Sequence, residues 1–242
     1  MVDCMNNHIV KKVFAVLLLV AMVMIARESV QLASVLGDNT KVVTDTENTV
    51  VIDAGHGGID PGKVGINDAL EKDINLQIAL KLARNLEANG VNVVMTRTTD
   101  KGLYNENDSN KKVQDMKKRL SIIEEANPIL AISVHQNSYP DESVCGPQVF
   151  YYKDSLEGEG AAKIMQKQLI ASLKPEKERE IKANNTYYLL KKTSVPLLIV
   201  ECGFMSNPSE ADMLTTDKYQ EQVAWAIYMG IMQYINSYNL SN

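Results

Sequence analysis

The chain has 242 residues, of which 45% are hydrophobic and 23% are charged, and its formal net charge at pH 7 is -5. This composition excludes an intrinsically disordered or low-complexity protein. The negative charge, together with the absence of a basic stripe with interleaved aromatic residues, excludes a general nucleic-acid binder.

A continuous apolar segment near the N-terminus predicts export from the cytoplasm. Residues 13–26 are all apolar, and Lys11 and Lys12 precede them. A transmembrane helix needs about 20 apolar residues, so this segment has the length of a signal-peptide core or of a short anchor. The two lysines would keep its N-terminal side in the cytoplasm. We therefore expect an exported chain that is either membrane-anchored or secreted.

The remainder of the chain is expected to form one folded domain behind a tether. The predicted parts are a signal peptide or membrane anchor over residues 1–35, a polar linker over residues 36–48 and the domain over residues 49–238. The cysteines are Cys4, Cys145 and Cys202, an odd number at wide separations. Because Cys4 precedes the apolar segment, at most one disulfide can form in the exported part.

Strands and helices alternate along the domain. Short apolar segments predict strands at residues 49–53, 91–96, 129–134, 148–152, 187–190 and 197–200. Apolar residues at helical spacing predict helices that begin near residue 70 and that span about 113–126, 158–173 and 218–235. This alternation predicts an α/β fold with a doubly wound, twisted, mostly parallel sheet and helices on both faces. A long polar loop at residues 100–112 is of a length typical of functional loops.

Four residues with chemically versatile side chains occur where predicted strands end or a predicted helix begins. His56, His135 and Glu201 each follow an apolar strand, and Glu71 lies in the first turn of the first helix. In doubly wound sheets, ligands bind beyond the carboxyl ends of the strands. We therefore expect the four side chains to meet at one edge of the sheet.

Two imidazoles and two carboxylates at one edge predict metal-assisted hydrolysis. Zinc hydrolases use three ligands of the His and Asp/Glu types and leave a fourth position for water, whose pKa the metal lowers to about 7. A separate carboxylate then carries a proton to the leaving group. We assign His56, Glu71 and His135 as zinc ligands and Glu201 as general base and acid. Burial after an apolar strand is expected to raise the pKa of Glu201.

Each of these residues also has a plainer interpretation when taken alone. His56 could be an ordinary loop residue and His135 a core histidine, while Glu71 could only complement the helix dipole. Glu201 could be half of an ion pair. The combination at matching strand ends favours the metal site.

Two other catalytic interpretations are weaker. The glycines at residues 55–58 are typical of phosphate-binding loops, but no helix begins directly after them, so their amides would not converge on a phosphate. Cys202 could serve a cysteine protease, but a cysteine after an apolar strand is more often inert packing.

The residues resemble the zinc-dependent N-acetylmuramoyl-L-alanine amidases, often called amidase 3, from about residue 49 to residue 234. The motifs that carry the resemblance are IDAGHGGIDPG at 52–62, LEKDINL at 70–76, TR at 96–97, SVHQNS at 133–138 and VECGFMSN at 200–207. The resemblance implies a zinc amidase domain that cuts the amide between N-acetylmuramic acid and L-alanine in peptidoglycan. It also implies zinc ligation by His56, Glu71 and His135, catalysis by Glu201 and, from its position, substrate contact by Asn137.

The domain layout is most similar to the CwlD-type spore-cortex amidases, which are anchored and lack wall-binding repeats. That similarity implies the muramic-δ-lactam pathway and a place on the cell-wall side that could include the forespore intermembrane space. Separately, a ligand set of two histidines and one glutamate, assembled from three distant segments, suggests an activating protein partner that assists zinc loading. The expected substrate is the peptidoglycan glycan with its stem peptide. We expect no nucleic-acid partner, and we expect membrane contact through the N-terminal segment. The alternatives are a zinc peptidoglycan carboxypeptidase or deacetylase, or a non-catalytic peptidoglycan-binding module.

Overall fold

The computed structural model describes residues 48–240. The predicted anchor and all but the last residue of the predicted linker lie outside the described residues. Within residues 48–240 the chain forms a sheet of six strands in the order β2-β1-β3-β6-β4-β5. Their bounds are β1 Thr49–Ala54, β2 Asn92–Met95, β3 Leu130–Asn137, β4 Gln148–Tyr152, β5 Lys182–Asn184 and β6 Leu197–Phe204.

The sheet is parallel from β2 to β6 and reverses direction at β4. The pairs β1–β2, β1–β3 and β3–β6 are parallel, β4 pairs with β6 antiparallel, and β5 pairs parallel with β4. Every residue of β1 and β6 is buried. Central parallel strands are buried on both faces, which explains their nearly continuous apolar sequences. The predicted mostly parallel sheet is confirmed.

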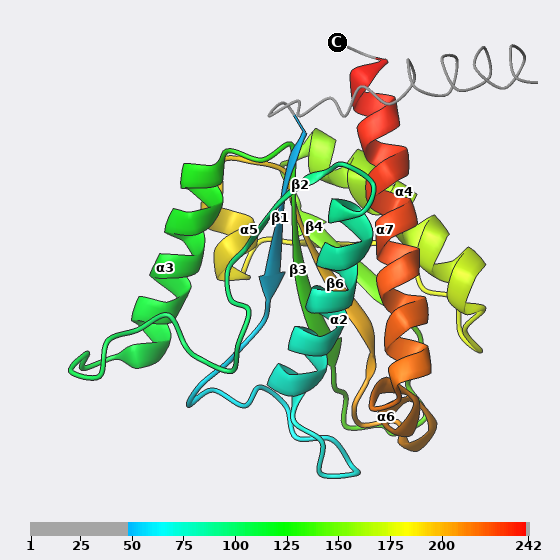
Figure 1. Cartoon of the computed structure of the whole chain (residues 1–242). Helices are drawn as coiled ribbons and strands as arrows, with labels where there is room; N and C mark the ends of the chain where they lie inside the picture. Colours follow the sequence, from blue (N-terminus) through cyan, green and yellow to red (C-terminus); the bar gives the residue numbers. More distant parts are fainter. Residues whose placement is uncertain (1–47, 241–242) are drawn as a thin grey trace, which may run out of the picture. The chain divides into compact units, whose positions relative to one another are not determined.

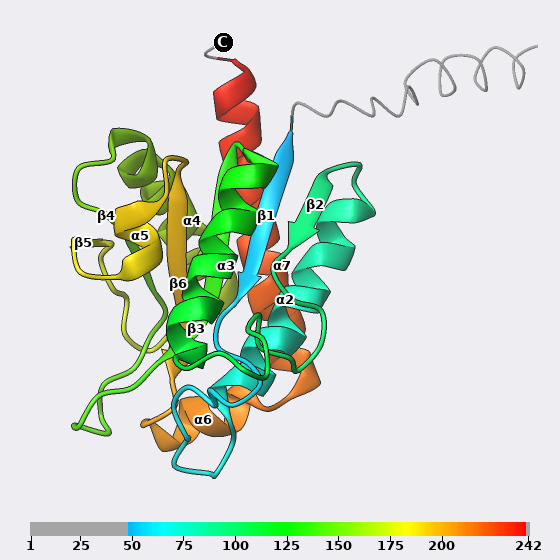
Figure 2. The ribbon, with the colours of Figure 1, turned by 90° about the vertical axis from the view of Figure 1, so that its left-hand side faces the viewer.

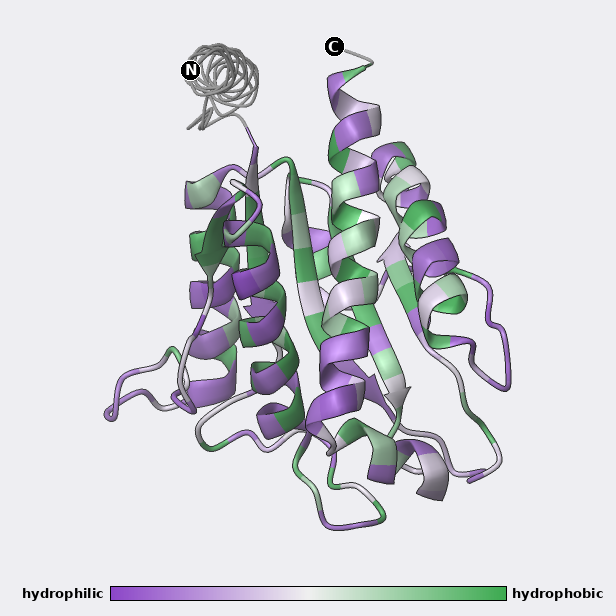
Figure 3. Cartoon of the chain, turned by 45° about the vertical axis from the view of Figure 1, so that its right-hand side comes forward, coloured by the Kyte–Doolittle hydropathy of each residue, from purple (hydrophilic) through white to green (hydrophobic). Residues whose placement is uncertain are grey.

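Helices cover both faces of this sheet, as Figures 1 and 2 show. The helices α2, α4 and α7 pack on one face, and α3 and the short α5 pack on the other. Their bounds are α2 Glu71–Glu87, α3 Lys111–Ala126, α4 Leu156–Leu173, α5 Tyr188–Lys192, α6 Pro208–Leu214 and α7 Asp217–Asn239. Figure 3 shows both hydrophobic and hydrophilic residues on the helices. This pattern is typical of helices that pack one side against a sheet and expose the other to solvent.

Three short elements differ from the sequence prediction. Residues 187–190 were expected to form a strand, but Tyr188–Lys192 form the helix α5, which buries Leu189 and Leu190 against the sheet. The three-residue strand β5 and the helix α6 have no counterpart among the predicted elements. Helix α6 begins with Asn207 as its N-cap, whose side chain accepts from Glu210 N, and with a proline in its first turn.

Among residues 48–240, no helix is long and apolar enough to span a bilayer.

Candidate metal centre

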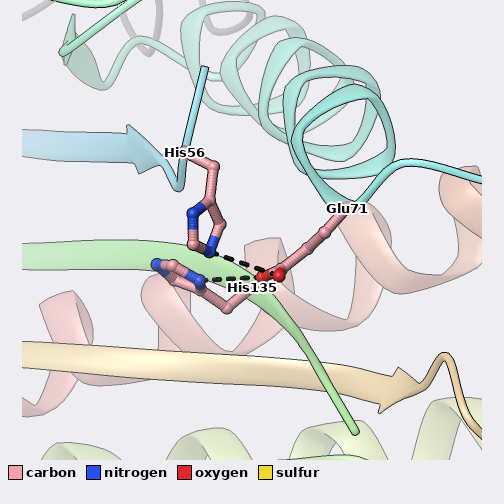
Figure 4. A group of neighbouring side chains, drawn as sticks. All are labelled: His56, Glu71 and His135. Carbon is pink, nitrogen blue, oxygen red and sulfur yellow. Dashed lines mark hydrogen bonds and ion pairs between the residues drawn. The ribbon is translucent and has the colours of Figure 1, made fainter. Parts of the chain in front are cut away.

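Three side chains from separate segments converge at the carboxyl ends of β1 and β3. His56 follows β1, Glu71 is the first residue of α2, and His135 lies in β3. Figure 4 shows both imidazoles directed toward the Glu71 carboxylate. The distance from His56 Nε2 to Glu71 Oε2 is 3.2 Å, and that from His135 Nδ1 to Glu71 Oε1 is 3.0 Å. One donor atom from each residue lies within 4.8 Å of the other two.

This arrangement fits a zinc ion in both donor chemistry and spacing. Zinc takes imidazole nitrogen and carboxylate oxygen at about 2.0–2.2 Å, so two ligands of a tetrahedral ion lie roughly 3.3 Å apart. The imidazole-to-carboxylate distances at this cluster are 3.0 and 3.2 Å. The three residues could therefore hold one metal ion.

Two glycines give the ligands their room. A Cβ on Gly55 would lie 2.3 Å from the His135 ring, and a Cβ on Gly62 would lie 2.5 Å from Glu71 Oε2. Gly62 also has a φ of 70°, which is unfavourable for other residues. The glycines of the motif at residues 52–62 thus serve close packing around the cluster.

The Glu71 carboxylate is fixed as an anion. It accepts hydrogen bonds from the backbone N–H groups of Lys63 (2.8 Å) and Gln136 (3.1 Å), and from the side-chain amide of Asn75 (3.4 Å). Burial alone would raise the pKa of Glu71, but its hydrogen bonds and opposite charges at His135 and His56 hold that pKa far below its usual range. A buried, preoriented anion is suited to bind a cation.

His56 is oriented by a carboxylate on its other ring nitrogen. The distance from His56 Nδ1 to Asp60 Oδ2 is 2.9 Å, and Asp60 in turn accepts from Lys112 Nζ at 2.8 Å. Burial opposes a charge on His56, but Glu71 and Asp60 outweigh it and raise the pKa of the imidazole. A ring that donates Nδ1–H to Asp60 presents the lone pair of Nε2 to the cluster, an arrangement common at metal sites.

Two buried arginines hold the backbone that carries His56. Arg119 donates to the carbonyl oxygens of Ala54 (2.7 Å) and His56. Arg97 donates to the carbonyl oxygens of Ala54 (2.8 Å) and Gly55 (3.0 Å). His56 has a φ of 61°, a left-handed conformation that costs free energy for a residue with a Cβ. The arginines stabilise this turn and so fix the position of the imidazole.

The Arg119 charge is balanced by two aspartates. Arg119 Nη1 lies 2.6 Å from Asp53 Oδ1, and Arg119 Nε lies 2.6 Å from Asp115 Oδ2. Asp53 also accepts from the hydroxyls of Thr96 (2.7 Å) and Ser133 (2.5 Å). Burial opposes ionisation of Asp53, but the Arg119 charge and the two hydroxyls lower its pKa to about 2. The network beneath the site is therefore ionised and hydrogen-bonded.

Glu201 lies beside the cluster in a contrasting environment. It pairs in register with His135 across β3 and β6, and only 7% of its surface is exposed. Its Oε2 atom has no hydrogen-bond partner among the described residues. Burial raises the pKa of Glu201 to about 7 and outweighs the lowering by the His135 charge, while the Glu71 charge adds a smaller rise. Such an unpartnered buried carboxylate is rare in proteins and is a common feature of catalytic sites.

The cluster and Glu201 open into one cavity of about 610 Å³. Its walls include Tyr104 from the long polar loop, Met116 from α3, Tyr187 just before α5 and Asn137 at the end of β3. A cavity of this size accommodates part of an extended ligand. The structure therefore places Asn137 on the cavity wall.

The sequence prediction of a shared location is correct for all four residues, with one change of detail. His135 and Glu201 were expected to follow strands, but both lie within strands, because β3 continues to Asn137 and β6 to Phe204. The register between these strands shifts between His135 and Asn137. The two side chains consequently stand on neighbouring strands rather than on loops.

Several residues that support the cluster were missed from the sequence. Asn75 occurs four residues after Glu71, on the mostly apolar buried face of α2, and Arg119 interrupts the apolar face of α3. A polar side chain on a buried helix face is the signal that could have identified both. Asp60 carried no such signal, because its loop has no regular pattern.

The cysteine alternative is not supported by the structure. Cys145 and Cys202 are both buried and free, so they do not form a disulfide with each other. Burial raises the pKa of the Cys202 thiol well above its usual value. A protonated, enclosed thiol is a poor nucleophile.

Comparison with known proteins finds one family. The family model described as N-acetylmuramoyl-L-alanine amidase matches residues 50–233. The germination-specific N-acetylmuramoyl-L-alanine amidase of Bacillus subtilis (strain 168) is 38% identical over 188 residues, which cover 76% of this chain and 78% of the relative.

Solved structures show the same similarity. The CwlD amidase of Clostridioides difficile, solved in complex with the GerS lipoprotein, has a TM-score of 0.76 and 39% identity, covering 78% of this chain and 99% of that one. The N-acetylmuramoyl-L-alanine amidase AmiC2 of Nostoc punctiforme has a TM-score of 0.70 and 32% identity, covering 78% of this chain and 98% of that one.

Proposed function

This chain belongs to the N-acetylmuramoyl-L-alanine amidase family, whose members cleave the amide between N-acetylmuramic acid and L-alanine in peptidoglycan. On that premise we propose that this chain hydrolyses the same amide with zinc held by His56, Glu71 and His135. Glu201 is the proposed catalytic carboxylate. We assign the catalytic domain to residues 49–238.

The proposed division of work follows from the two carboxylates. His56, Glu71 and His135 would hold the zinc ion, which when bound would supply Lewis-acid polarisation and a water of lowered pKa. Glu201 accepts a proton from the attacking water and passes it to the leaving nitrogen of L-alanine. Burial raises the pKa of Glu201 in the metal-free protein to about 7, and a carboxyl group that is less acidic than usual is better suited to return the proton to the leaving nitrogen. Glu71 is oriented by three hydrogen bonds and kept ionised by the two histidines, so it stays a ligand.

The observation that carries this proposal is the unpartnered Oε2 atom of Glu201 next to the three ligands. A structural role alone would have provided that oxygen with a donor, because an unmade buried hydrogen bond costs about 1–3 kcal/mol or more for a charged group. An oxygen left free beside a metal site is available to the reacting water. A module that only binds peptidoglycan has no need of it.

The substrate would extend along the cavity from the cluster. Asn137 lines this cavity, and no described residue accepts from its side-chain amide. We assign Asn137 to substrate binding, as a donor to a carbonyl group of the peptide. The aromatic residues that line the cavity would contact the apolar parts of the bound substrate.

The biological setting is proposed from the relatives. The Bacillus subtilis relative is named a germination-specific amidase, and the CwlD amidase was solved with a lipoprotein. We infer that this chain acts on spore-cortex peptidoglycan in the muramic-δ-lactam pathway and that a protein partner assists it. The N-terminal segment would export it and hold it at the membrane, on the cell-wall side or in the forespore intermembrane space.

The test is zinc content combined with product mass for the full chain and for Glu201→Gln. The wild type should contain zinc and release an intact stem peptide from purified peptidoglycan. Glu201→Gln should keep its zinc and lose activity by about 10²–10⁴-fold, the usual contribution of a general acid–base group. Full activity in Glu201→Gln, or after complete zinc removal, would contradict the mechanism. Release of a single terminal residue or of acetate would instead identify a carboxypeptidase or a deacetylase.

A further inference from the structure

A second cavity of about 460 Å³ adjoins the catalytic one at the β4–β5 edge of the sheet. Asn137 and Tyr187 line both cavities, so the two are neighbours along one surface. A ligand that is extended beyond the reacting bond can therefore pass from the first cavity into the second.

The second cavity carries two cationic side chains that form no ion pair with a described acidic residue. Arg179 and Lys182 line it, and neither forms an ion pair within the part of the chain that the structure describes. Arg179 Nε donates to the carbonyl oxygen of Cys145 at 2.7 Å, while its terminal nitrogens have no partner among residues 48–240. The chain has a net charge of -5, so two unpaired cations in one cavity form a local positive site on a negatively charged protein.

Aromatic rings hold both cations in place. The Arg179 guanidinium lies 4.7 Å from the centre of the Phe204 ring, and Lys182 Nζ lies 5.6 Å from that of Phe150. The Phe150 and Tyr187 rings are 5.5 Å apart, which joins this group to the shared wall of the two cavities. Cations over buried rings are positioned at low entropic cost, and their charge remains available to a ligand.

Glu210 is the acidic residue that interacts with Arg179, but its carboxylate is already hydrogen-bonded to the backbone. Glu210 interacts electrostatically with Arg179, but its two oxygens accept from the backbone N–H groups of Gly146 (2.9 Å) and Phe204 (2.8 Å). Glu210 therefore fixes the backbone at this place and leaves the terminal nitrogens of Arg179 free to donate. The cavity is prepared for an external anion.

We propose that this second cavity, lined by Arg179 and Lys182, is the subsite for a carboxylate of the stem peptide. The inference rests on the proposed amidase function. At the scissile bond the muramic acid carboxyl is consumed in the amide and the sugars beside it are uncharged, whereas the peptide beyond L-alanine carries free carboxylates. An anion-binding cavity next to the catalytic one therefore suits the peptide side, and guanidinium groups bind carboxylates in bidentate geometry.

The kinetic test compares Arg179→Gln and Lys182→Gln on two glycan–peptide substrates, one with free stem carboxylates and one with those carboxylates amidated. On the free-carboxylate substrate, KM should rise about 10-fold or more in each variant, as expected for a lost charge-assisted hydrogen bond, with kcat nearly unchanged. On the amidated substrate the variants should match the wild type. The matched control is Lys167→Gln, which removes an exposed charge from α4, outside this cavity.

A binding measurement separates failure of the subsite from failure of the amidase function. Calorimetry with full-length Glu201→Gln and a synthetic stem tetrapeptide should show weaker binding when Arg179→Gln or Lys182→Gln is added. Unchanged peptide affinity and unchanged KM in both variants would overturn the subsite, even if the wild type cleaves peptidoglycan. Equal losses on the free and amidated substrates would also overturn it, because the cations would then not act through carboxylates.

Discussion

The β1–α2 side of the site and its β6 side each hold one buried glutamate. The two glutamates differ in their hydrogen bonding, and their pKa values are shifted in opposite directions. On the β1–α2 side, Glu71 receives three hydrogen bonds and two imidazoles, and its pKa lies far below the usual range. On the β6 side, Glu201 has one oxygen without any partner among the described residues, and burial raises its pKa to about 7.

This contrast teaches how one residue type can serve two roles within one cavity. A carboxylate that is fully hydrogen-bonded stays ionised and can hold a cation, whereas one that is desolvated exchanges protons near neutral pH. Two titratable groups whose environments shift their pKa values in opposite directions are the usual sign of such a division of roles. The difference lies in the backbone N–H groups and side chains that each strand or helix brings near.

The sharpest way to break the comparison is to neutralise each glutamate in turn. Glu71→Gln should lose zinc on dialysis and with it all stem-peptide release, because a ligand is gone. The loss of zinc affinity should exceed the roughly 10–100-fold effect typical of residues that only support ligands. Glu201→Gln should retain zinc, as measured by elemental analysis. Equal zinc contents in the two variants would show that their roles do not differ.

The second prediction concerns the ionised network beneath the β1–α2 side. Arg119→Met leaves Asp53 buried without its cation, so the free energy of unfolding should fall by about 3–5 kcal/mol. Urea unfolding at pH 7.5 measures this effect. Lys163→Gln, which breaks an exposed pair with Glu159, is the control and should leave the unfolding midpoint in place. Equal midpoints for Arg119→Met and wild type would show that the network does not support the fold.

The third prediction concerns the stability cost of the β6 side in zinc-free protein. Because burial raises the pKa of Glu201 from 4.5 to about 7, the folded state holds this proton more tightly than the unfolded state. Stability should therefore fall as the pH rises from about 4.5 to 7. Glu201→Gln lacks this loss and should be more stable than wild type above pH 7, by about 3 kcal/mol. Denaturant unfolding in chelator at pH 4.5 and pH 8 measures the difference. A stability difference that is the same at both pH values would contradict the raised pKa.

The smallest effect is expected at Asp60, which only orients His56. Asp60→Asn should weaken zinc binding by about 10–100-fold without abolishing it, since the carboxylate on the outer ring nitrogen is lost. Competition with a zinc chelator gives the affinity. Asp154→Asn, an exposed change between β4 and α4, should leave that affinity unaltered. An Asp60→Asn affinity equal to that of wild type would remove Asp60 from the site.

The sequence predicts the features that depend on regular patterns. The apolar strands β1, β3 and β6 and the helical spacing in α2 predict, before any coordinates are known, that His56, Glu71, His135 and Glu201 lie at one edge. Such patterns arise because central strands and covering helices must bury apolar side chains.

The same reasoning fails where short elements depend on tertiary contacts. Strand β5 has only three residues, two of them polar, and it exists because β4 offers it a partner. In α5, Leu189 and Leu190 resemble a strand in sequence but pack as one helical turn. The Asp53–Arg119 pair joins residues 66 positions apart, so no local pattern could have linked them.

The most direct test of the central claim is a crystal structure of the zinc-loaded chain with anomalous data recorded at the zinc edge. The predicted result is one anomalous peak about 2.0–2.2 Å from His56 Nε2, His135 Nδ1 and a Glu71 oxygen, with Glu201 beside it and not bonded to it. A peak coordinated by Glu201 in place of Glu71, or no peak at this cluster in an active preparation, would contradict the account.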